Sequence, residues 1–312
     1  MHRAAATLDG EATVTAAPLR ESARLLDLGG EERPDLVAIA AGVDAAALKA
    51  LTVAGYHLLI ETPVMDAEQA EDLARCAKQS GSIITVAWHE GAFPMARGAM
   101  GLIRDKKLGP VHSVFVEYHL ARSASVAGTH VVSMLAGAAE NLVGTITNLK
   151  MRAVCAEVVL NPVTRAHDDA QVLLRFEGHT RGVMTLSRTG ARAGFSVRVY
   201  GELASLAWSS EAAGELEFAP VGKARQVLTA AHAESGVLAA EAARNPASPE
   251  GATEALANLY RGTYEAIRAK REGRARKAMG RDLPTTSDLS RACRFTQGVM
   301  ESARGGGGWA EL

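Results

Sequence analysis

The first 90 residues alternate between two hydrophobic patterns, one typical of buried strands and one typical of amphipathic helices. Asp35–Ala41, Tyr56–Ile60 and Ser82–Trp88 are short, nearly continuous apolar runs, as expected for strands that are buried on both faces. Ala45–Ala54 and Ala67–Ser80 lie between them and have the spacing of helices. Because alternating strands and helices usually build a parallel sheet covered by helices, we expect an α/β domain here.

The beginning of the chain adds three shorter predicted elements. His2–Leu8 is predicted to be a helix, and Glu11–Ala16 (EATVTA) alternates like a strand. Leu19–Leu28 is predicted to be a helix that ends at the glycine pair Gly29-Gly30.

After Pro94 the pattern of hydrophobic residues becomes typical of a sheet that has one face exposed to solvent. Met95–Lys106 is a predicted helix, and Val111–His119 alternates between apolar and polar residues. Five more strand candidates follow at regular spacing: Thr145–Val154, Ala170–Phe176, Arg181–Arg188, Ser196–Gly201 and Ala204–Ser209. Two long predicted helices, Ala252–Arg271 and Ser287–Arg304, close the chain.

The predicted fold class is therefore α/β, with two domains. A truncated Rossmann-like parallel-sheet domain covers residues 1–90, and an α+β domain with a large, mostly antiparallel open sheet covers residues 91–312. Since an open sheet of this size commonly buries its free face against another subunit, we expect a homodimer or tetramer.

Charge and composition give no reason to expect nucleic acid, a membrane or a metal as a partner. The 34 basic and 35 acidic residues give a net charge of −1, which offers no electrostatic reason to expect nucleic acid or an anionic membrane. No stretch is long and apolar enough for a signal peptide or a membrane span, so a cytoplasmic protein is expected. Cys76, Cys155 and Cys293 are widely separated, which argues against a disulfide framework and against a zinc site.

Several segments together resemble the Gfo/Idh/MocA family of oxidoreductases. AGYHLLIETPV (Ala54–Val64) is similar to the family's "AGKHVLVEKP" strand and loop, and SVAGTH (Ser125–His130) to its "DxGxH" helix start. Gly91–Tyr118 resembles the stretch that links the family's two domains. LLRFEGHTRGVMTLSR, VRVYGELASLAW and SPEGATEALANLYRGTYEAI resemble its second sheet and closing helix. The resemblance covers nearly the whole chain, and it implies a substrate among sugars, cyclitols and related small polar molecules.

The chain departs from this family where a dinucleotide is held. No GxGxxG turn occurs near the start, although a Rossmann domain uses one to bring backbone N–H groups to the pyrophosphate. EATVTA runs into Ala17-Pro18 instead of ending in the acidic residue that binds the ribose, and the "TPxxxH" segment is AGVD (41–44). The lysine of "EKP" is Thr62 and the aspartate of "DxGxH" is Val126, neither of which can shuttle a proton. We therefore expect no cofactor.

The missing first strand would be central in the family's sheet. An empty central slot leaves backbone groups unpaired, at a cost on the order of several kcal/mol each. We therefore expect EATVTA to move beside Asp35–Ala41 and to fill the slot.

Three residues are candidates for acid/base catalysis. His130 matches the family's catalytic histidine, while Glu61 and His89 follow predicted strands at the carboxyl edge, where α/β sheets place their ligands. For each, the alternative is structural: a retained histidine at His130, a loop brace at Glu61, and a hydrogen-bonded loop residue at His89.

Four further residues are candidates for substrate binding: Tyr118, Arg122, Thr129 and Trp88. Arg122 could clamp a carboxylate or phosphate, or it could form a surface ion pair. His167-Asp168-Asp169 imitates a metal-ligand cluster, but adjacent side chains on an extended chain point to opposite sides, so a turn is predicted and no metal is expected.

Three functions remain open from the sequence. The first is a cofactor-independent, non-redox enzyme (a lyase, isomerase or cyclase) that acts on a small polar or sugar-like molecule in the old substrate cleft. The second is a non-catalytic partner subunit of an active paralogue. The third is an ordinary NAD(P)-dependent oxidoreductase whose true start lies upstream.

Overall fold

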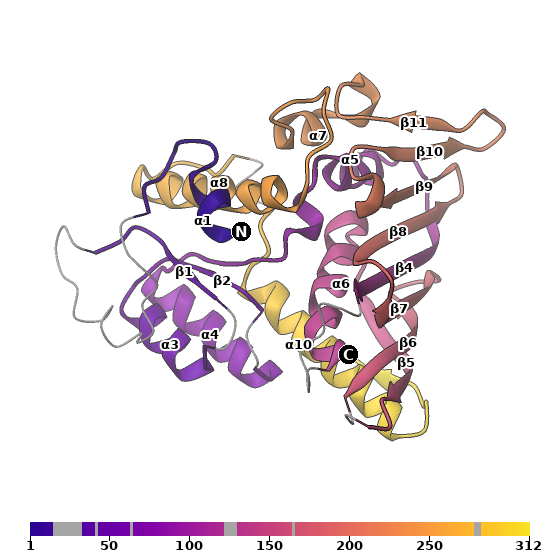
Figure 1. Ribbon diagram of the computed structural model, residues 1–312, viewed down its shortest axis with the longest axis horizontal. Coiled ribbons are helices and arrows are strands. Elements are labelled where there is room, and N and C mark those ends of the chain that lie inside the picture. Colours follow the sequence, from indigo (N-terminus) through magenta and orange to yellow (C-terminus); the bar gives the residue numbers. More distant parts are fainter. Residues whose placement is uncertain (15–32, 41–42, 63–64, 122–129, 164–165, 278–281) are drawn as a thin grey trace. The chain divides into compact units, whose positions relative to one another are not determined.

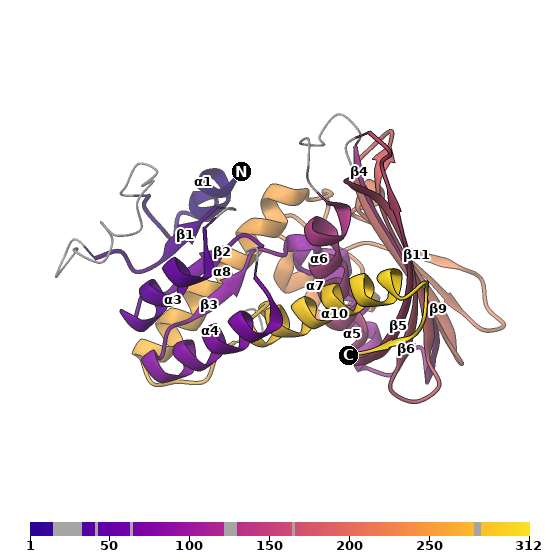
Figure 2. The same cartoon turned by 90° about the horizontal axis from the view of Figure 1, so that it is seen from below.

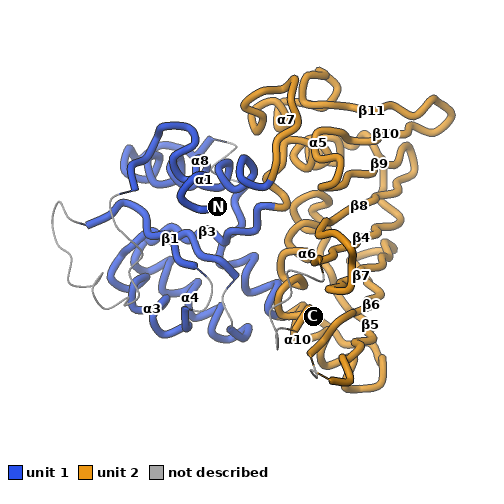
Figure 3. The backbone as a smooth tube through the Cα atoms, in the orientation of Figure 1, with its two compact units in different colours: residues 1–89, 252–293 blue, residues 90–251, 294–312 orange. Residues whose placement is uncertain are grey.

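The computed structural model describes residues 1–14, 33–40, 43–62, 65–121, 130–163, 166–277 and 282–312 (Figure 1 and, turned by 90°, Figure 2). Two compact units divide the chain (Figure 3). Unit 1 consists of residues 1–89 and 252–293, and unit 2 of residues 90–251 and 294–312. Residues 252–293, although distant in sequence, belong to the same unit as the N-terminal part of the chain.

Unit 1 is built on a three-stranded parallel sheet. Its strands lie in the order β1 (Val37–Ile39), β2 (Leu58–Ile60), β3 (Ile84–Val86). All three residues of β2 and of β3 are buried, as the continuous apolar runs predict. Helices α1 (His2–Thr7) and α8 (Ala252–Arg271) lie on one side of the strands, and α3 (Ala45–Val53) and α4 (Ala67–Ser80) on the other (Figure 1).

The bounds of α4 follow from its end signals. The Asp66 side chain accepts from the Gln69 backbone N–H, and the Gln69 side chain accepts from the Asp66 N–H, which is a complete capping box. Gly81 ends the helix in the left-handed conformation, with φ of 71°. The predicted helix Ala67–Ser80 is thereby confirmed.

The predicted strand EATVTA is wrong for its described residues. Glu11–Val14 has no strand structure and does not pair with β1, and residues 15–16 lie outside the described residues. Gly10, with φ of 70°, turns the chain after α1, and the Glu11 carboxylate pairs with Arg268 of α8 at 3.1 Å. These contacts hold the segment against α8 instead of along β1. The predicted helix Leu19–Leu28 also lies outside the described residues.

Unit 2 contains a nine-stranded sheet in the order β11-β10-β9-β8-β4-β7-β6-β5-β12. Every neighbouring pair is antiparallel except β4 and β7, which are parallel. The strands are β4 (Val111–Ala121), β5 (Met151–Leu160), β6 (His167–Phe176), β7 (Arg181–Gly190), β8 (Gly194–Gly201), β9 (Ala204–Ser209), β10 (Leu216–Pro220), β11 (Gln226–Leu228) and β12 (Ala310–Glu311). The predicted fold class, a parallel α/β part and a large, mostly antiparallel sheet, is confirmed.

Helices cover one face of this sheet and leave the other open. Helix α6 (Val131–Thr147) packs on β4, β6 and β7, and α10 (Thr286–Arg304) lies on the same side (Figure 2). Strand residues therefore alternate between buried and exposed, as in β6. The remaining helices are α5 (Pro94–Arg104), α7 (Val237–Ala242) and three short turns, η2 (His89–Ala92), η4 (Ser210–Ala212) and η5 (Ala233–Ser235).

The predicted strand Thr145–Val154 begins too early. Thr145–Thr147 is the last turn of α6, which ends at Asn148 in the left-handed conformation with φ of 54°. The strand β5 starts only at Met151. β-Branched residues favour strands, but here the helix continues because Ile146 and Thr147 are buried on its packed face.

None of the helices in the described ranges combines the length and the apolarity that crossing a membrane requires.

Candidate functional site

Three of the predicted site residues lie just beyond the carboxyl ends of β2 and β3. Glu61 follows β2 directly, and Trp88 and His89 follow β3. The carboxylate of Glu61 is partly open, with 37% of its side chain exposed, whereas Trp88 is 3% exposed. This edge is the place where open α/β sheets bind ligands.

A histidine near the N-terminus of the chain forms a hydrogen bond with Glu61. His2 of α1 places Nε2 2.9 Å from Glu61 Oε1 and Nδ1 2.8 Å from the hydroxyl oxygen of Tyr260. The His2 and Tyr260 rings meet edge to face, with centroids 5.9 Å apart. The contact depends on α1, which packs against α8 and so brings residue 2 beside residue 260. Glu61, His2 and Tyr260 thus form a hydrogen-bonded row, called the Glu–His–Tyr row below.

The protonation state of Tyr260 follows from its burial. Burial raises the pKa of Tyr260 well above its usual value, and the neighbouring Tyr264 and Glu61 raise it further. Tyr260 therefore keeps its proton and donates it in a hydrogen bond to Nδ1 when His2 is neutral, which leaves the Nε2 proton for Glu61. When His2 is doubly protonated, the Tyr260 oxygen accepts instead. The row can therefore gain or lose a proton without losing its hydrogen bonds.

Thr62 and Trp88 form a second contact at the same edge. The Trp88 indole N–H donates to the Thr62 hydroxyl at 2.7 Å. Because the indole is buried, this bond satisfies a donor that would otherwise lack a partner. The residue that stands in place of the "EKP" lysine therefore holds a neighbouring loop.

In unit 2, Tyr118 of β4 contacts a buried carboxylate. Its hydroxyl donates to Glu90 Oε1 at 2.5 Å, and its ring lies 5.2 Å from that of Phe195. Glu90 is 3% exposed, and its Oε2 has no hydrogen-bond partner among the described residues. Burial, together with the charge and hydrogen bond of Glu90, raises the pKa of Tyr118 well above its usual value.

His130 lies at the start of α6 and pairs with His167. Its Nδ1 accepts from the His167 backbone N–H at 3.2 Å, and the two ring centroids are 4.2 Å apart. In the neutral ring the proton is therefore on Nε2. Burial lowers the pKa of His167, and the charges of His130 and Arg304 lower it further.

The segment His167–Asp169 is part of a strand, so the predicted turn is wrong. It begins β6, where Asp168 accepts from the Asn161 side-chain amide at 2.7 Å and pairs with Arg188 at 3.4 Å. No group of three His, Cys, Asp or Glu side chains in the described part of the chain could hold a metal ion.

Within each unit, the structure brings predicted residues together with residues that the sequence did not reveal. Glu61 lies with His2 and Tyr260, Tyr118 with Glu90, and His130 with His167. Arg122 and Thr129 lie outside the described residues. His2 and Tyr260 are separated by 258 positions, so only the packing of α1 on α8 pairs them. Glu90 follows His89 directly. Its position just after a predicted strand could have identified it as a candidate site residue.

No protein-family model matches the chain, and a search of curated proteins finds no match. Solved structures do match. An oxidoreductase from Sinorhizobium meliloti is 26% identical, with a TM-score of 0.83 over 92% of this chain and 81% of that one. An inositol dehydrogenase homolog from Azotobacter vinelandii, in complex with NADH and myo-inositol, is 22% identical with a TM-score of 0.83, over 93% and 81%. Levoglucosan dehydrogenase, in complex with NADH and levoglucosan, is 17% identical with a TM-score of 0.76, over 94% and 83%.

Proposed function

Because this chain is a Gfo/Idh/MocA-type protein by its fold, we propose that it acts on a small polar, sugar-like molecule, by proton transfer and without a dinucleotide. The observation that carries the proposal is the Glu–His–Tyr row at the carboxyl edge of β2.

The residues present at this edge do not fit a dinucleotide. Helix α1 directs His2 to Glu61. Thr62, in the position of the family's lysine, accepts from Trp88. We therefore route no step of the reaction through a nicotinamide.

The row is suited to general acid/base catalysis. Glu61 is the partly open end, so its carboxylate can take a proton from a substrate carbon or hydroxyl. His2 continues to donate its Nε2 hydrogen to the carboxyl group, and the buried Tyr260 holds the imidazole in place. Return of the proton to another atom of the substrate completes an isomerisation, and its transfer to a leaving group completes an elimination. Neither reaction needs an oxidant.

His130 is the second candidate for a proton-transfer group. With Nδ1 occupied by the His167 amide, Nε2 is the nitrogen that can donate a proton to a substrate. Tyr118 and Glu90 in the same unit are proposed to contribute to substrate binding.

Hydrogen exchange tests the proposal even though the substrate is unidentified. The full chain is incubated in D₂O with a panel of polyols, aldoses, ketoses and their acids, and loss of individual C–H signals is followed by NMR. We expect exchange or conversion of at least one compound. Glu61→Gln should slow it by roughly 100-fold or more, because one general base contributes about that much.

Two tyrosines of α8 provide a matched pair. Tyr260→Phe removes the hydroxyl that holds His2 and should slow exchange by about tenfold, as expected for one hydrogen bond. Tyr264→Phe removes a hydroxyl that donates to the Ala6 carbonyl oxygen and should leave the rate unchanged. Equal rates for Glu61→Gln and the unaltered protein would refute the role of the row.

Titration with NADH and NADPH tests the cofactor part separately. We expect no heat of binding by calorimetry. Binding of either, followed by a change in nicotinamide absorbance with a polyol, would establish an oxidoreductase instead. Absence of both turnover and dinucleotide binding, with capture of an active paralogue, would establish a partner subunit.

A further inference from the structure

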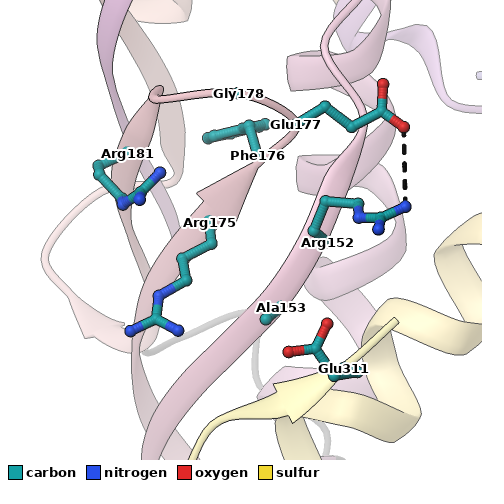
Figure 4. Close-up of a pocket in the computed structure, with 8 residues that line it drawn as sticks. All are labelled: Arg152, Ala153, Arg175, Phe176, Glu177, Gly178, Arg181 and Glu311. Atoms are coloured by element: carbon teal, nitrogen blue, oxygen red, sulfur yellow. Dashed lines mark ion pairs between the residues drawn. The ribbon is translucent and has the colours of Figure 1, made fainter.

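A basic depression lies on the open face of the sheet, at the corner formed by β5, β6, β7 and β12. It has a volume of about 440 Å³, and three arginines line it, Arg152, Arg175 and Arg181 (Figure 4). None of the predicted site residues borders it. We propose that this depression binds a small anion of the phosphate type through Arg175 and Arg181.

The register of the sheet places two of these arginines side by side. Arg175 of β6 and Arg181 of β7 are direct cross-strand partners in an antiparallel pair. Both are exposed on the same face. Like charges in directly opposite positions destabilise a sheet, and an anion between them converts this repulsion into two attractions.

Neither arginine is paired with a carboxylate among the described residues. The Arg175 guanidinium lies over the Trp309 ring, 3.7 Å from its centroid. Arg181 donates to the Thr180 carbonyl oxygen at 2.8 Å. These contacts orient the guanidinium groups, and neither group forms an ion pair with a carboxylate of the described residues.

A small residue gives this corner of the sheet its hollow shape. Ala153 of β5 is the cross-strand partner of both Arg175 and Glu311, so a methyl group separates two long side chains. The small residue provides the space in which a ligand can sit. Glu311 borders this space opposite Arg175 and can accept a hydrogen bond from a hydroxyl group of the ligand (Figure 4). Glu177 is already paired with Arg152, at 3.9 Å.

The bound chemistry is therefore a compact dianion, such as a phosphate group. Arginine forks match the oxygens of such a group geometrically, which distinguishes them from simple point charges. The phosphate group can be inorganic or can belong to a small hydroxylated ester, and Glu311 favours the ester because it can accept from a hydroxyl.

Trp309 provides the readout. Trp88 and Trp208 are buried, whereas Trp309 is 40% exposed and touches Arg175. Inorganic phosphate is titrated into the full chain at low ionic strength, against chloride at matched ionic strength, while Trp fluorescence and heat are recorded. We expect saturable binding of roughly millimolar affinity, as two charge-assisted bonds allow, and loss of the fluorescence change in Trp309→Phe. Glycerol 3-phosphate, as a hydroxylated ester, should bind more tightly than inorganic phosphate.

Variants decide whether the arginine pair is the site. Arg175→Gln and Arg181→Gln should each weaken phosphate binding by about tenfold, while Arg225→Gln, an exposed arginine outside the depression, should leave it within about twofold. Arg181→Lys keeps the charge but not the fork, and should bind with intermediate affinity. Circular dichroism confirms that each variant is folded.

Two outcomes overturn the proposal. Equal phosphate binding by the unaltered protein and both glutamine variants excludes this site. A change of oligomeric mass in Arg175→Gln without any effect of phosphate means that carboxylates of a second copy fill the depression instead.

Discussion

At the scale of single residues, burial determines the protonation state of His57. His57 is neutral because burial lowers its pKa to about 4, with Lys270, Arg271 and Arg33 nearby adding to the effect. Its Nδ1 accepts from the Ile83 backbone N–H at 3.0 Å and so links the start of β2 to that of β3.

A dependence of stability on pH follows from His57. Between pH 6.5 and 4 the unfolded chain binds a proton at His57 that the folded chain does not, so stability is present above pH 6.5 and is lost as the pH falls toward 4. The loss is on the order of 1–2 kcal/mol after allowance for partial exposure. Urea unfolding at pH 7 and pH 5 measures it.

The matched variant is His57→Asn, whose side-chain oxygen can replace Nδ1 as the acceptor. It should unfold with a smaller difference between the two pH values than the unaltered protein. An identical difference would mean that other groups, such as carboxylates, cause the whole effect.

Thr62 gives a second prediction at this scale. Thr62→Val removes the acceptor of the buried Trp88 N–H and should lower the free energy of unfolding by about 1–3 kcal/mol. Thr62→Ser keeps the hydroxyl and should cost clearly less. Thermal unfolding followed by Trp fluorescence compares the two, and an equal loss in both would show that the methyl group matters instead of the hydrogen bond.

At the scale of elements, the large sheet depends on close contact between β4 and β7, its parallel pair. Gly182 of β7 is the register partner of Val114, and a Cβ at Gly182 would lie 2.7 Å from the Val114 carbonyl oxygen. The strands can therefore approach at this point only because residue 182 has no side chain. Glycine in a strand interior often marks such a close backbone approach.

Two glycine substitutions should have opposite signs. Gly182→Ala pushes β7 away from β4 and should destabilise unit 2 by at least about 2 kcal/mol, as overpacking against a backbone atom does. Gly101→Ala in α5 meets nothing closer than the Leu238 side chain at 3.7 Å and should stabilise the helix by up to about 1 kcal/mol. Denaturant unfolding measures both, and equal effects would contradict the contact at Val114.

At the scale of the whole molecule, the open face of the nine-stranded sheet carries exposed aromatic residues. Phe115 of β4 and Tyr200 of β8 meet edge to face, with ring centroids 5.8 Å apart, and each is more than 40% exposed. Exposed aromatic residues are enriched at subunit interfaces. Self-association through this face is therefore our proposal for the assembly.

Sedimentation velocity checks this proposal. The unaltered chain should sediment as a dimer or tetramer, and Phe115→Glu should shift it toward the monomer because it buries a charge in the interface. Val237→Glu, which changes an exposed apolar residue of α7 outside the sheet, should leave the mass unchanged. A monomeric unaltered protein would exclude the proposal.

The sequence by itself determined the elements whose causes are local. The buried strands β2 and β3, the helix α4 with its capping box, and the alternating strands β4, β6, β7, β8 and β9 follow from periodicity and end signals that neighbouring residues supply. The carboxyl-edge positions of Glu61 and Trp88 follow from the strand ends. The loss of the "EKP" lysine is read directly at Thr62.

Only the tertiary structure decided which distant residues meet. The packing of α1 on α8 pairs His2 with Tyr260 and Glu61, and the same helix holds Glu11 through Arg268, so the segment predicted to complete the sheet does not do so. Likewise, β-sheet register places Arg175 opposite Arg181. These contacts depend on which faces of distant elements pack together, and the energy of that packing is shared among many residues. Periodicity in the sequence shows only which face of an element is buried, and it does not show which other element covers that face.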